Sequence, residues 1–371
     1  MQKTWLATAL LVAAVASAPL AHADQNSGGT LTVAVFGDWP YAPVGNPDFL
    51  LQNAPLLVNS VNSDPDVAFI IHVGDIHSGN QPCTSAGILP PISTSIPDWN
   101  QQIYFQFQQF QKPFIYTPGD NEWTDCHKTK ESKSGAPLKE LASVRSLFFA
   151  RPGHTFGLED MPVTSQAMVS DPESTDAHYV ENVMWEDIPS RTVFATLNVP
   201  GSNNDTLPWT NGFEDPVLHP AEVTQRNAAN MHWLDAAFDV AEQHHDKAVV
   251  IALQADMWDL SALQPGGDGL NAYTPFVQEL ATQALHFGRP VLLINGDSHL
   301  FEVDQPLADP SSAKGQVHNT QAVKNLTRIT VQGSTNPPAE WLRLSIGSNP
   351  SNPFSWVNVP YCANPSSATC Q

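Results

Sequence analysis

Residues 31–38 read LTVAVFGD, and residues 67–75 read VAFIIHVGD. Each stretch is a short apolar run, rich in Val, Ile and Phe, that ends in Gly-Asp, and this pattern predicts a buried strand followed by a turn. Similar runs predict strands over 113–117, 192–199, 248–253 and 290–294. Because these runs alternate with helical patterns, the sequence predicts an α/β fold whose largely parallel sheet is covered by helices.

The helical patterns have apolar residues at helical spacing, and they cover residues 99–110, 138–148, 231–241 and 274–284. Thr274 is the expected N-cap of the last helix, and Pro275 its first helical residue. After residue 298 the predicted strands 299–304, 326–332 and 341–346 follow one another without a helix, which indicates an antiparallel C-terminal addition. We expect residues 24–371 to form a single domain, with residues 151–190 as a long excursion from it.

Composition and the N-terminus restrict the possible functions. The chain has 371 residues with 16 Lys+Arg and 37 Asp+Glu, a formal net charge of −21. Such a charge repels phosphate backbones and excludes nucleic-acid binding through a basic surface. An apolar stretch too short to span a membrane precedes Ala21-His22-Ala23, so residues 1–23 are predicted to be a secretory signal peptide. We therefore expect an exported protein, periplasmic or extracellular, with no membrane span in the mature chain.

The four cysteines are interpreted as disulfide partners, because an even number in an exported chain favours bridges over metal thiolates. Four cysteines permit three connectivities. We predict Cys83–Cys126, because each of these residues follows a Gly-Asp loop, and Cys362–Cys370, which would staple the C-terminal tail.

Four Gly-Asp pairs mark the predicted site. Each lies at or near the end of a predicted strand: Gly37-Asp38, Gly74-Asp75, Gly119-Asp120 and Gly296-Asp297. Ligands of open α/β sheets bind at the carboxyl ends of the strands, so we expect the four loops to converge. A single Gly-Asp is usually a turn. Several carboxylates in one crevice repel one another unless a cation lies between them, so the set predicts a divalent metal site.

Taken together, these motifs resemble the calcineurin-like metallophosphoesterases. The matching segments are FGD at 36–38, VGDIH at 73–77, PGDNE at 118–122 and NGDSH at 295–299. The resemblance implies a four-layer α/β/β/α sandwich of two mixed sheets flanked by helices. It also implies an enzyme that hydrolyses a phosphate mono- or diester of a small substrate by attack of a metal-bound hydroxide. The chain is more distantly similar to purple acid phosphatases, although Ser78 stands where their metal-binding Tyr would be.

The resemblance assigns three residues directly. Asp38 and His299 match ligands of the first metal, and Asp75 matches the carboxylate that bridges two metals in the family. We therefore expect one or two bound divalent ions.

The other motif positions depart from the family pattern. Pro40 replaces the His of the first motif, Asp120 an Asn ligand, Asn121 the catalytic His, Gln254 a further His, and Asp297 the first His of the last motif. Asp120, Asn121, Gln254 and Asp297 are still expected to ligate metal, with Asp256 as a nearby substitute. Because oxygen replaces imidazole, Mn²⁺, Mg²⁺ or Ca²⁺ is favoured, and Fe or Zn is possible.

With Asn121 in the usual acid position, His77 and His127 are the candidates for protonating the leaving group. Arg145, Arg226 and the polar loop 199–204 are weaker candidates for contacts with a substrate.

Two other functions stay open from the sequence. One is a non-catalytic metal- or phosphate-binding protein on the same scaffold, and the other is an envelope protein whose acidic loops hold Ca²⁺ for stability.

Overall fold

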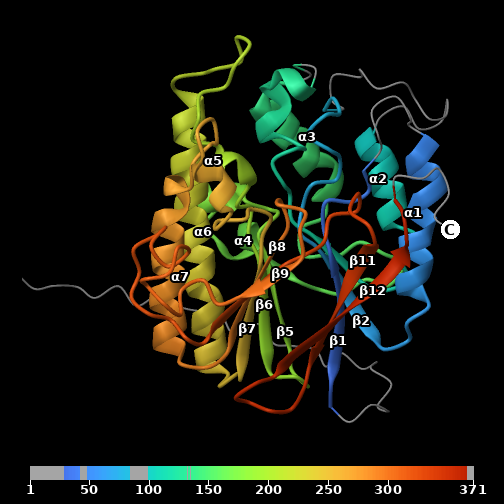
Figure 1. The fold of residues 1–371 in the computed structure, drawn as a ribbon, viewed down its shortest axis with the longest axis vertical. Helices are drawn as coiled ribbons and strands as arrows, with labels where there is room; N and C mark the ends of the chain where they lie inside the picture. Colours follow the sequence, from blue (N-terminus) through green and yellow to red (C-terminus); the bar gives the residue numbers. More distant parts are fainter. Residues whose placement is uncertain (1–28, 42–47, 84–98, 132, 134, 366–371) are drawn as a thin grey trace, which may run out of the picture.

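Two mixed β-sheets form the centre of the computed structural model, which describes residues 29–41, 48–83, 99–131, 133 and 135–365 (Figure 1). The predicted signal peptide, residues 1–23, lies outside the described residues. At the centre of the five-stranded sheet lies β1 (Leu31–Phe36); the strand pairs on one side of it are parallel, and those on the other side are antiparallel. Its order is β12 (Phe354–Cys362), β11 (Ala339–Ile346), β1 (Leu31–Phe36), β2 (Val67–His72) and β3 (Phe114–Tyr116).

The seven-stranded sheet has a parallel centre, in which β6, β7, β8 and β10 run in the same direction. Antiparallel pairs complete both of its edges. Its order is β4 (Thr164–Ser165), β5 (Val183–Asp187), β6 (Thr192–Thr196), β7 (Ala248–Ala252), β8 (Val291–Asn295), β10 (Leu326–Thr330) and β9 (Glu302–Asp304).

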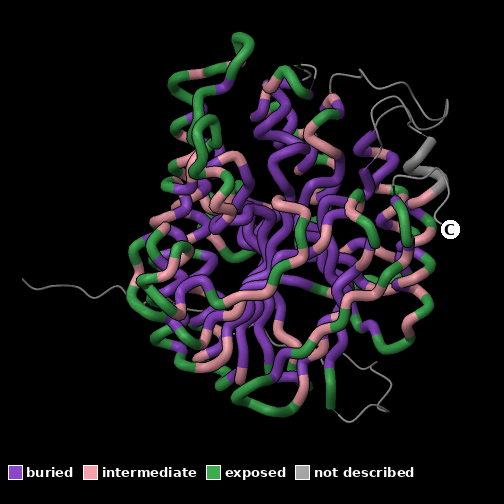
Figure 2. Tube along the Cα trace, in the orientation of Figure 1, coloured by how far each residue is buried: buried purple, intermediate pink, exposed green. Residues whose placement is uncertain are grey.

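The two sheets pack face to face and helices cover their outer faces, so the molecule has the expected four layers. Val35 and Ile71 of one sheet share an apolar core with Val250 and Ile294 of the other. On the outer face of the seven-stranded sheet lie α6 (Leu218–Gln243) and α7 (Thr274–Phe287), and on that of the five-stranded sheet lie α1 (Asp48–Asn62), α2 (Trp99–Phe107) and α3 (Pro137–Phe148). Figure 2 shows the resulting band of buried strands between the helices.

Two details of the predicted fold are wrong. Thr274 is the first residue of α7 rather than its cap, because the N-cap is Tyr273. The C-terminal addition is not wholly antiparallel, because β10 pairs in parallel with β8. The preceding strand β9 reverses direction at the sheet edge, and the connection over 305–325 then brings the chain back without a helix.

Several elements were not predicted from the sequence. Among them are the helix α1, the C-terminal strand β12, and three elements inside the supposed excursion 151–190, namely β4, the short helix α4 (Gln166–Val169) and β5. Within the described part of the chain, no helix combines the length and apolar character needed to cross a membrane.

The disulfide Cys83–Cys126 is confirmed, with a Cα–Cα distance of 5.6 Å. It joins the loop after β2 to the 3₁₀ turn Thr124–His127, which follows β3. The second pairing involves Cys370, which lies outside the described residues, as do residues 84–98 of the loop closed by the first bridge.

Candidate metal centre

The Gly-Asp loops converge where the parallel strands of both sheets end. The five-stranded sheet supplies Asp38, Asp75 and Asp120 after β1, β2 and β3. The seven-stranded sheet supplies Gln254 after β7, and Asp297 and His299 after β8. The two sets are in contact, because Gln254 Nε2 donates to Asp75 Oδ2 at 3.2 Å and to Asp120 Oδ1 at 3.1 Å.

Left-handed backbone turns aim these side chains into the crevice. Asp38, Asp75, Asp297 and His299 have φ values of 49°, 59°, 74° and 64°. Such conformations are unfavourable for non-glycine residues, and they concentrate at functional sites where the surrounding structure holds them.

Gly119 allows the Asp75 loop and the Asp120 loop to lie against each other. A Cβ atom at this position would be 2.1 Å from Asp75 Oδ1 and 2.5 Å from the Asp75 backbone nitrogen. Any side chain at position 119 would therefore prevent the two loops from lying this close.

Two groups of possible metal ligands share one residue. The first is Asp38, Asp75 and His299, and the second is Asp75, Asp120 and Asp297. In each group, one donor atom from every residue lies within 4.8 Å of the others. Asp75 belongs to both groups, so the arrangement offers two adjacent cation positions with one carboxylate between them.

The electrostatics of the crevice fit bound cations. Burial, and then the charge of Asp120, raises the pKa of Asp75 well above its usual value. Burial raises the pKa of Asp120 and of Asp297 as well. Asp38 is fully buried, and its Oδ2 has no hydrogen-bond partner. A carboxylate oxygen buried without a partner is costly, and a divalent ion would remove this cost. The residues present therefore fit a metal centre.

His299 lies at the open side of the first group, with its side chain about one-third exposed (32%). Its Nε2 is 3.2 Å from Asp38 Oδ1. Burial alone would lower the pKa of His299, but the Asp38 carboxylate raises it to about 9.

Two residues without a role in the sequence analysis contribute to this centre. The Tyr41 hydroxyl is 3.3 Å from Asp75 Oδ2 and 3.4 Å from both Asp38 Oδ1 and His299 Nε2, so it offers a further oxygen donor to the first group. Glu122 Oε1 accepts hydrogen bonds from the backbone N–H groups of Asp75 and Gly119, at 3.0 and 2.7 Å. Burial raises the pKa of Glu122 to about 7. Glu122 closes the quoted PGDNE motif, but the spacing gave no sign that it would support the Asp75 loop.

Gln254 and Asn121, two of the expected ligands, direct N–H groups toward the centre. Gln254 Oε1 accepts the Gly201 backbone N–H, which fixes the side-chain amide with its nitrogen toward the carboxylates. Asn121 donates its side-chain N–H to the Tyr41 hydroxyl and its backbone N–H to Asp75 Oδ1, each at 3.3 Å. In this arrangement Gln254 orients the carboxylates instead of ligating.

The two candidate proton donors are neutral at physiological pH. His77 is completely buried, neither of its ring nitrogens has a hydrogen-bond partner, and burial lowers its pKa to about 4. His127 Nδ1 accepts the Thr210 backbone N–H at 2.9 Å, and burial lowers its pKa to about 4 as well. Neither side chain carries an imidazolium proton to donate at pH 7.

The polar loop after β6 does reach the centre. Gly201–Asp205, labelled α5 in Figure 1, contains a left-handed turn in which Ser202, Asn203 and Asn204 have φ values of 52°, 51° and 57°. Ser202 Oγ lies 2.8 Å from Asp120 Oδ2, and Lys128 Nζ donates to the same Oγ at 2.8 Å. The turn therefore links Asp120 to the ammonium group of Lys128, which is partly exposed to solvent.

The other candidates have structural partners. Arg145 forms a two-pronged ion pair with Glu181, at 2.6 and 2.9 Å. Arg226 is fully buried and bonds Glu222 and Asn204. The Asp256 carboxylate is occupied by Arg328 and Ser298, so it is not a substitute ligand here.

His72, the last residue of β2, hydrogen-bonds to the loops that carry Asp38 and Asp75. Its Nδ1 accepts the Gly74 backbone N–H at 3.1 Å, so the proton lies on Nε2, which donates to the Trp39 carbonyl at 2.7 Å. The ring is completely buried, and this burial lowers its pKa to about 4.

We expect His72 to make the protein acid-sensitive. Its contribution to stability is full above the unfolded pKa of 6.5 and decreases as the pH falls toward the folded value of about 4. The loss through this residue at pH 5 is about 2 kcal/mol. Urea unfolding at pH 7.5 and pH 5, with chelator present, should show a smaller loss for His72→Asn than for wild type. Equal losses would contradict the assignment.

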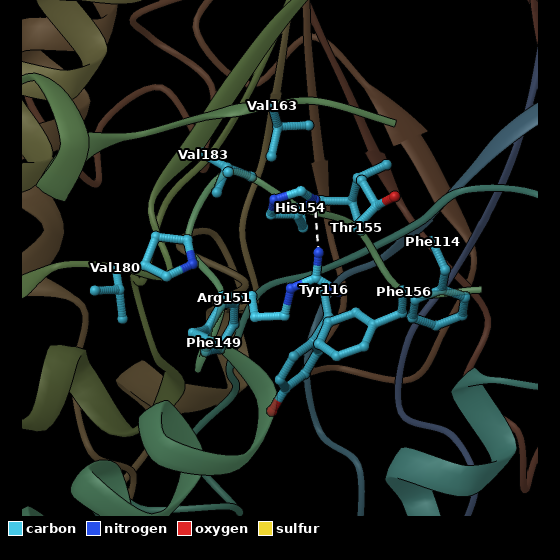
Figure 3. A pocket seen from close by; sticks show the side chains of 13 residues that line it. Phe114, Tyr116, Phe149, Arg151, His154, Thr155, Phe156, Val163, Val180 and Val183 are labelled. Atoms are coloured by element: carbon cyan, nitrogen blue, oxygen red, sulfur yellow. Dashed lines mark hydrogen bonds between the residues drawn. The ribbon is translucent and has the colours of Figure 1, made fainter. Parts of the chain in front are cut away.

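The pocket shown in Figure 3 is separate from the metal centre. It lies among β3, β5 and the segment 149–163, and its lining is mostly apolar. Arg151 Nη2 and His154 Nδ1, two of its polar atoms, are 3.5 Å apart. None of the residues of the two ligand groups lines it.

Comparison with protein-family models found no match to this chain, and a search of curated proteins found none either.

Proposed function

We propose that the protein is an exported, metal-dependent phosphoesterase that hydrolyses a phosphate mono- or diester of a small molecule. The observation that carries the proposal is the pair of adjacent ligand groups joined by Asp75, at the carboxyl ends of strands from both sheets. Asp38, Asp75 and His299 would hold one divalent ion, and Asp75, Asp120 and Asp297 a second. Bound ions would polarise the phosphoryl oxygens and make a water molecule more nucleophilic.

The ligand set as a whole supports Mn²⁺, Mg²⁺ or Ca²⁺. Asp75, Asp120 and Asp297 offer only carboxylate oxygen, which these harder cations prefer. His299 adds one nitrogen to the other group, a mixed set that Mn²⁺ accepts and that can also bind Zn²⁺.

The chain's own cations support an anionic substrate. Lys128 pairs with Asp125 at 2.7 Å, and Lys130 pairs with the same carboxylate at 3.1 Å. Both Lys130 Nζ and Asn121 Oδ1 border Gly79, within 2.9 Å of where its Cβ would be. Lys128 Nζ also lies 3.7 Å from Asp268 Oδ2, so both lysines are ion-paired. Their partly offset positive charge would act beside the bound ions on a chain with a net charge of −21.

The neutral state of His77 and His127 restricts the substrate. A neutral imidazole is a poor acid, so neither residue would protonate a leaving alkoxide efficiently. The site therefore favours esters whose leaving group departs without a proton, such as aryl phosphates.

The test is hydrolysis of an aryl phosphate monoester and an aryl phosphate diester by chelator-treated protein, with Mn²⁺, Mg²⁺, Ca²⁺ or Zn²⁺ added separately. We expect turnover only after a divalent ion is restored, and more with Mn²⁺ or Mg²⁺ than with Zn²⁺. A rise in melting temperature with Mn²⁺ or Mg²⁺ but no turnover of either ester would favour the non-catalytic, metal-binding alternative. Failure to bind any divalent ion would contradict both the phosphoesterase and that metal-binding alternative.

A further inference from the structure

A second group of metal-capable side chains lies near the seven-stranded sheet, at the opposite end of its parallel strands from the metal centre. Glu186 belongs to β5, and His244 and Asp246 lie between the end of α6 and the start of β7. Because β5 runs antiparallel to β6, Glu186 lies beside the amino ends of β6 and β7, whereas the metal centre follows the carboxyl ends. A five-residue strand is about 16 Å long, so the two places are well separated.

The three side chains are close enough to bind one ion. One donor atom from each lies within 4.8 Å of the others, and His244 Nδ1 is 2.7 Å from Glu186 Oε2. Asp246 is 1% exposed, and its Oδ2 is buried without a hydrogen-bond partner. A buried, unpartnered carboxylate oxygen beside a second carboxylate is unfavourable unless a cation is bound.

The nearby protein cations are engaged elsewhere. Arg289 bonds the Asp246 main-chain carbonyl and pairs with Glu242 at 2.7 Å, Arg191 bonds the His245 carbonyl, and Lys247 Nζ donates to the Gly347 carbonyl at 2.6 Å. None of these hydrogen bonds or ion pairs involves the Asp246 carboxylate.

We propose that Glu186, His244 and Asp246 form a separate site for one transition-metal ion of the Zn²⁺ type. One imidazole and two carboxylates can bind zinc, whereas Mg²⁺ and Ca²⁺ prefer oxygen alone. The first ligand group of the metal centre offers the same donor types, so zinc binding at the proposed site has to be measured with the metal centre disabled. The side chains of His244 and Glu186 are 52% and 23% exposed, so an ion can enter from solvent and keep a water ligand.

A bound ion at this place would tie the β5–β6 hairpin to the C-terminal end of α6. Because an ion that binds only the folded state stabilises it by mass action, zinc should raise the melting temperature. The site is independent of the proposed hydrolysis, since none of its residues belongs to the metal centre.

The chain contains a matched control on α6, the helix that ends just before His244. His232 Nδ1 is 2.7 Å from Asp176 Oδ2, the distance found for His244 and Glu186, and its side chain is 65% exposed. His232 belongs to none of the metal-capable groups among the described residues.

The test is Zn²⁺ titration by calorimetry of the full chain carrying Asp75→Asn, which disables both groups of the metal centre. We expect binding that His244→Ala weakens by at least about tenfold and that His232→Ala leaves unchanged. In the Asp75→Asn background, zinc should raise the melting temperature of the parent protein and of the His232→Ala variant but not of the His244→Ala variant.

A second measurement avoids the Asp75 background. In the otherwise wild-type chain, dialysed against Zn²⁺, His244→Ala should retain one zinc equivalent fewer than His232→Ala. Equal zinc content and affinity in the two histidine variants would show adventitious surface binding only and overturn the proposal, as would the absence of zinc binding by folded Asp75→Asn protein.

Discussion

We expect Asp75→Asn to lower kcat/KM for an aryl phosphate by more than about 100-fold, because replacing a metal ligand costs at least as much activity as replacing a residue that supports one. Asp75 is the one residue common to both ligand groups, so its loss weakens both cation positions at once. Asn keeps the shape and one oxygen, so it can keep the bond that Asp75 Oδ1 accepts from the Asn121 backbone N–H, but its amide nitrogen cannot accept the bond that Oδ2 accepts from Gln254.

Although Asp75→Asn should lower activity, it should not lower the stability of the metal-free protein. Because burial raises the pKa of Asp75, the ionised carboxylate is unfavourable in the metal-free protein, and the amide removes that charge. In chelator at pH 8, urea unfolding should show Asp75→Asn to be at least as stable as wild type. Asp239→Asn, at an exposed position on α6, is the matched control, and it should change neither quantity. An Asp75→Asn protein with more than a tenth of wild-type turnover would refute the proposed site.

Gly119→Ala should abolish Mn²⁺ binding at the metal centre and destabilise the fold, by roughly 1–3 kcal/mol as for other overpacking substitutions. The added methyl would be 2.1 Å from Asp75 Oδ1 and 2.5 Å from the Asp75 backbone nitrogen. The backbone atom cannot move aside as a flexible side chain can, so the two loops must separate. The same shift would strain the bond from Gly119 N–H to Glu122.

Gly347→Ala is the matched control for this substitution. Its added methyl would meet only the Pro353 carbonyl oxygen, at 3.8 Å, an ordinary contact. Mn²⁺ titration and urea unfolding of the two variants side by side separate the effect of the site from the general effect of replacing glycine. Mn²⁺ binding by Gly119→Ala equal to that of Gly347→Ala would contradict the required close approach.

The strands that carry the site were predictable because their signal is local. An apolar run such as 31–36 ends in Gly-Asp, and neither feature depends on the rest of the chain. The same reasoning placed Asp38, Asp75, Asp120 and Asp297 at strand ends, which is where they lie.

What could not be predicted depends on contacts between distant segments. Tyr41 reaches Asp75 and His299 because two loops meet in space, and nothing in its neighbouring residues indicates this. Gln254 occupies the position expected for a ligand, but the Gly201 N–H on another loop turns its oxygen away. Likewise β10 joins β8 in parallel through a helix-free connection, a pairing that spacing alone does not reveal.

The division of the centre between two sheets has a consequence for biosynthesis. Asp38, Asp75 and Asp120 are translated early, but each ligand group is completed only by Asp297 or His299. The strand that flanks β1 on its other side, β11, is made later still. A nascent chain therefore cannot assemble either group until most of its length has been synthesised. Ions would bind at this place only in molecules whose two sheets have already packed together.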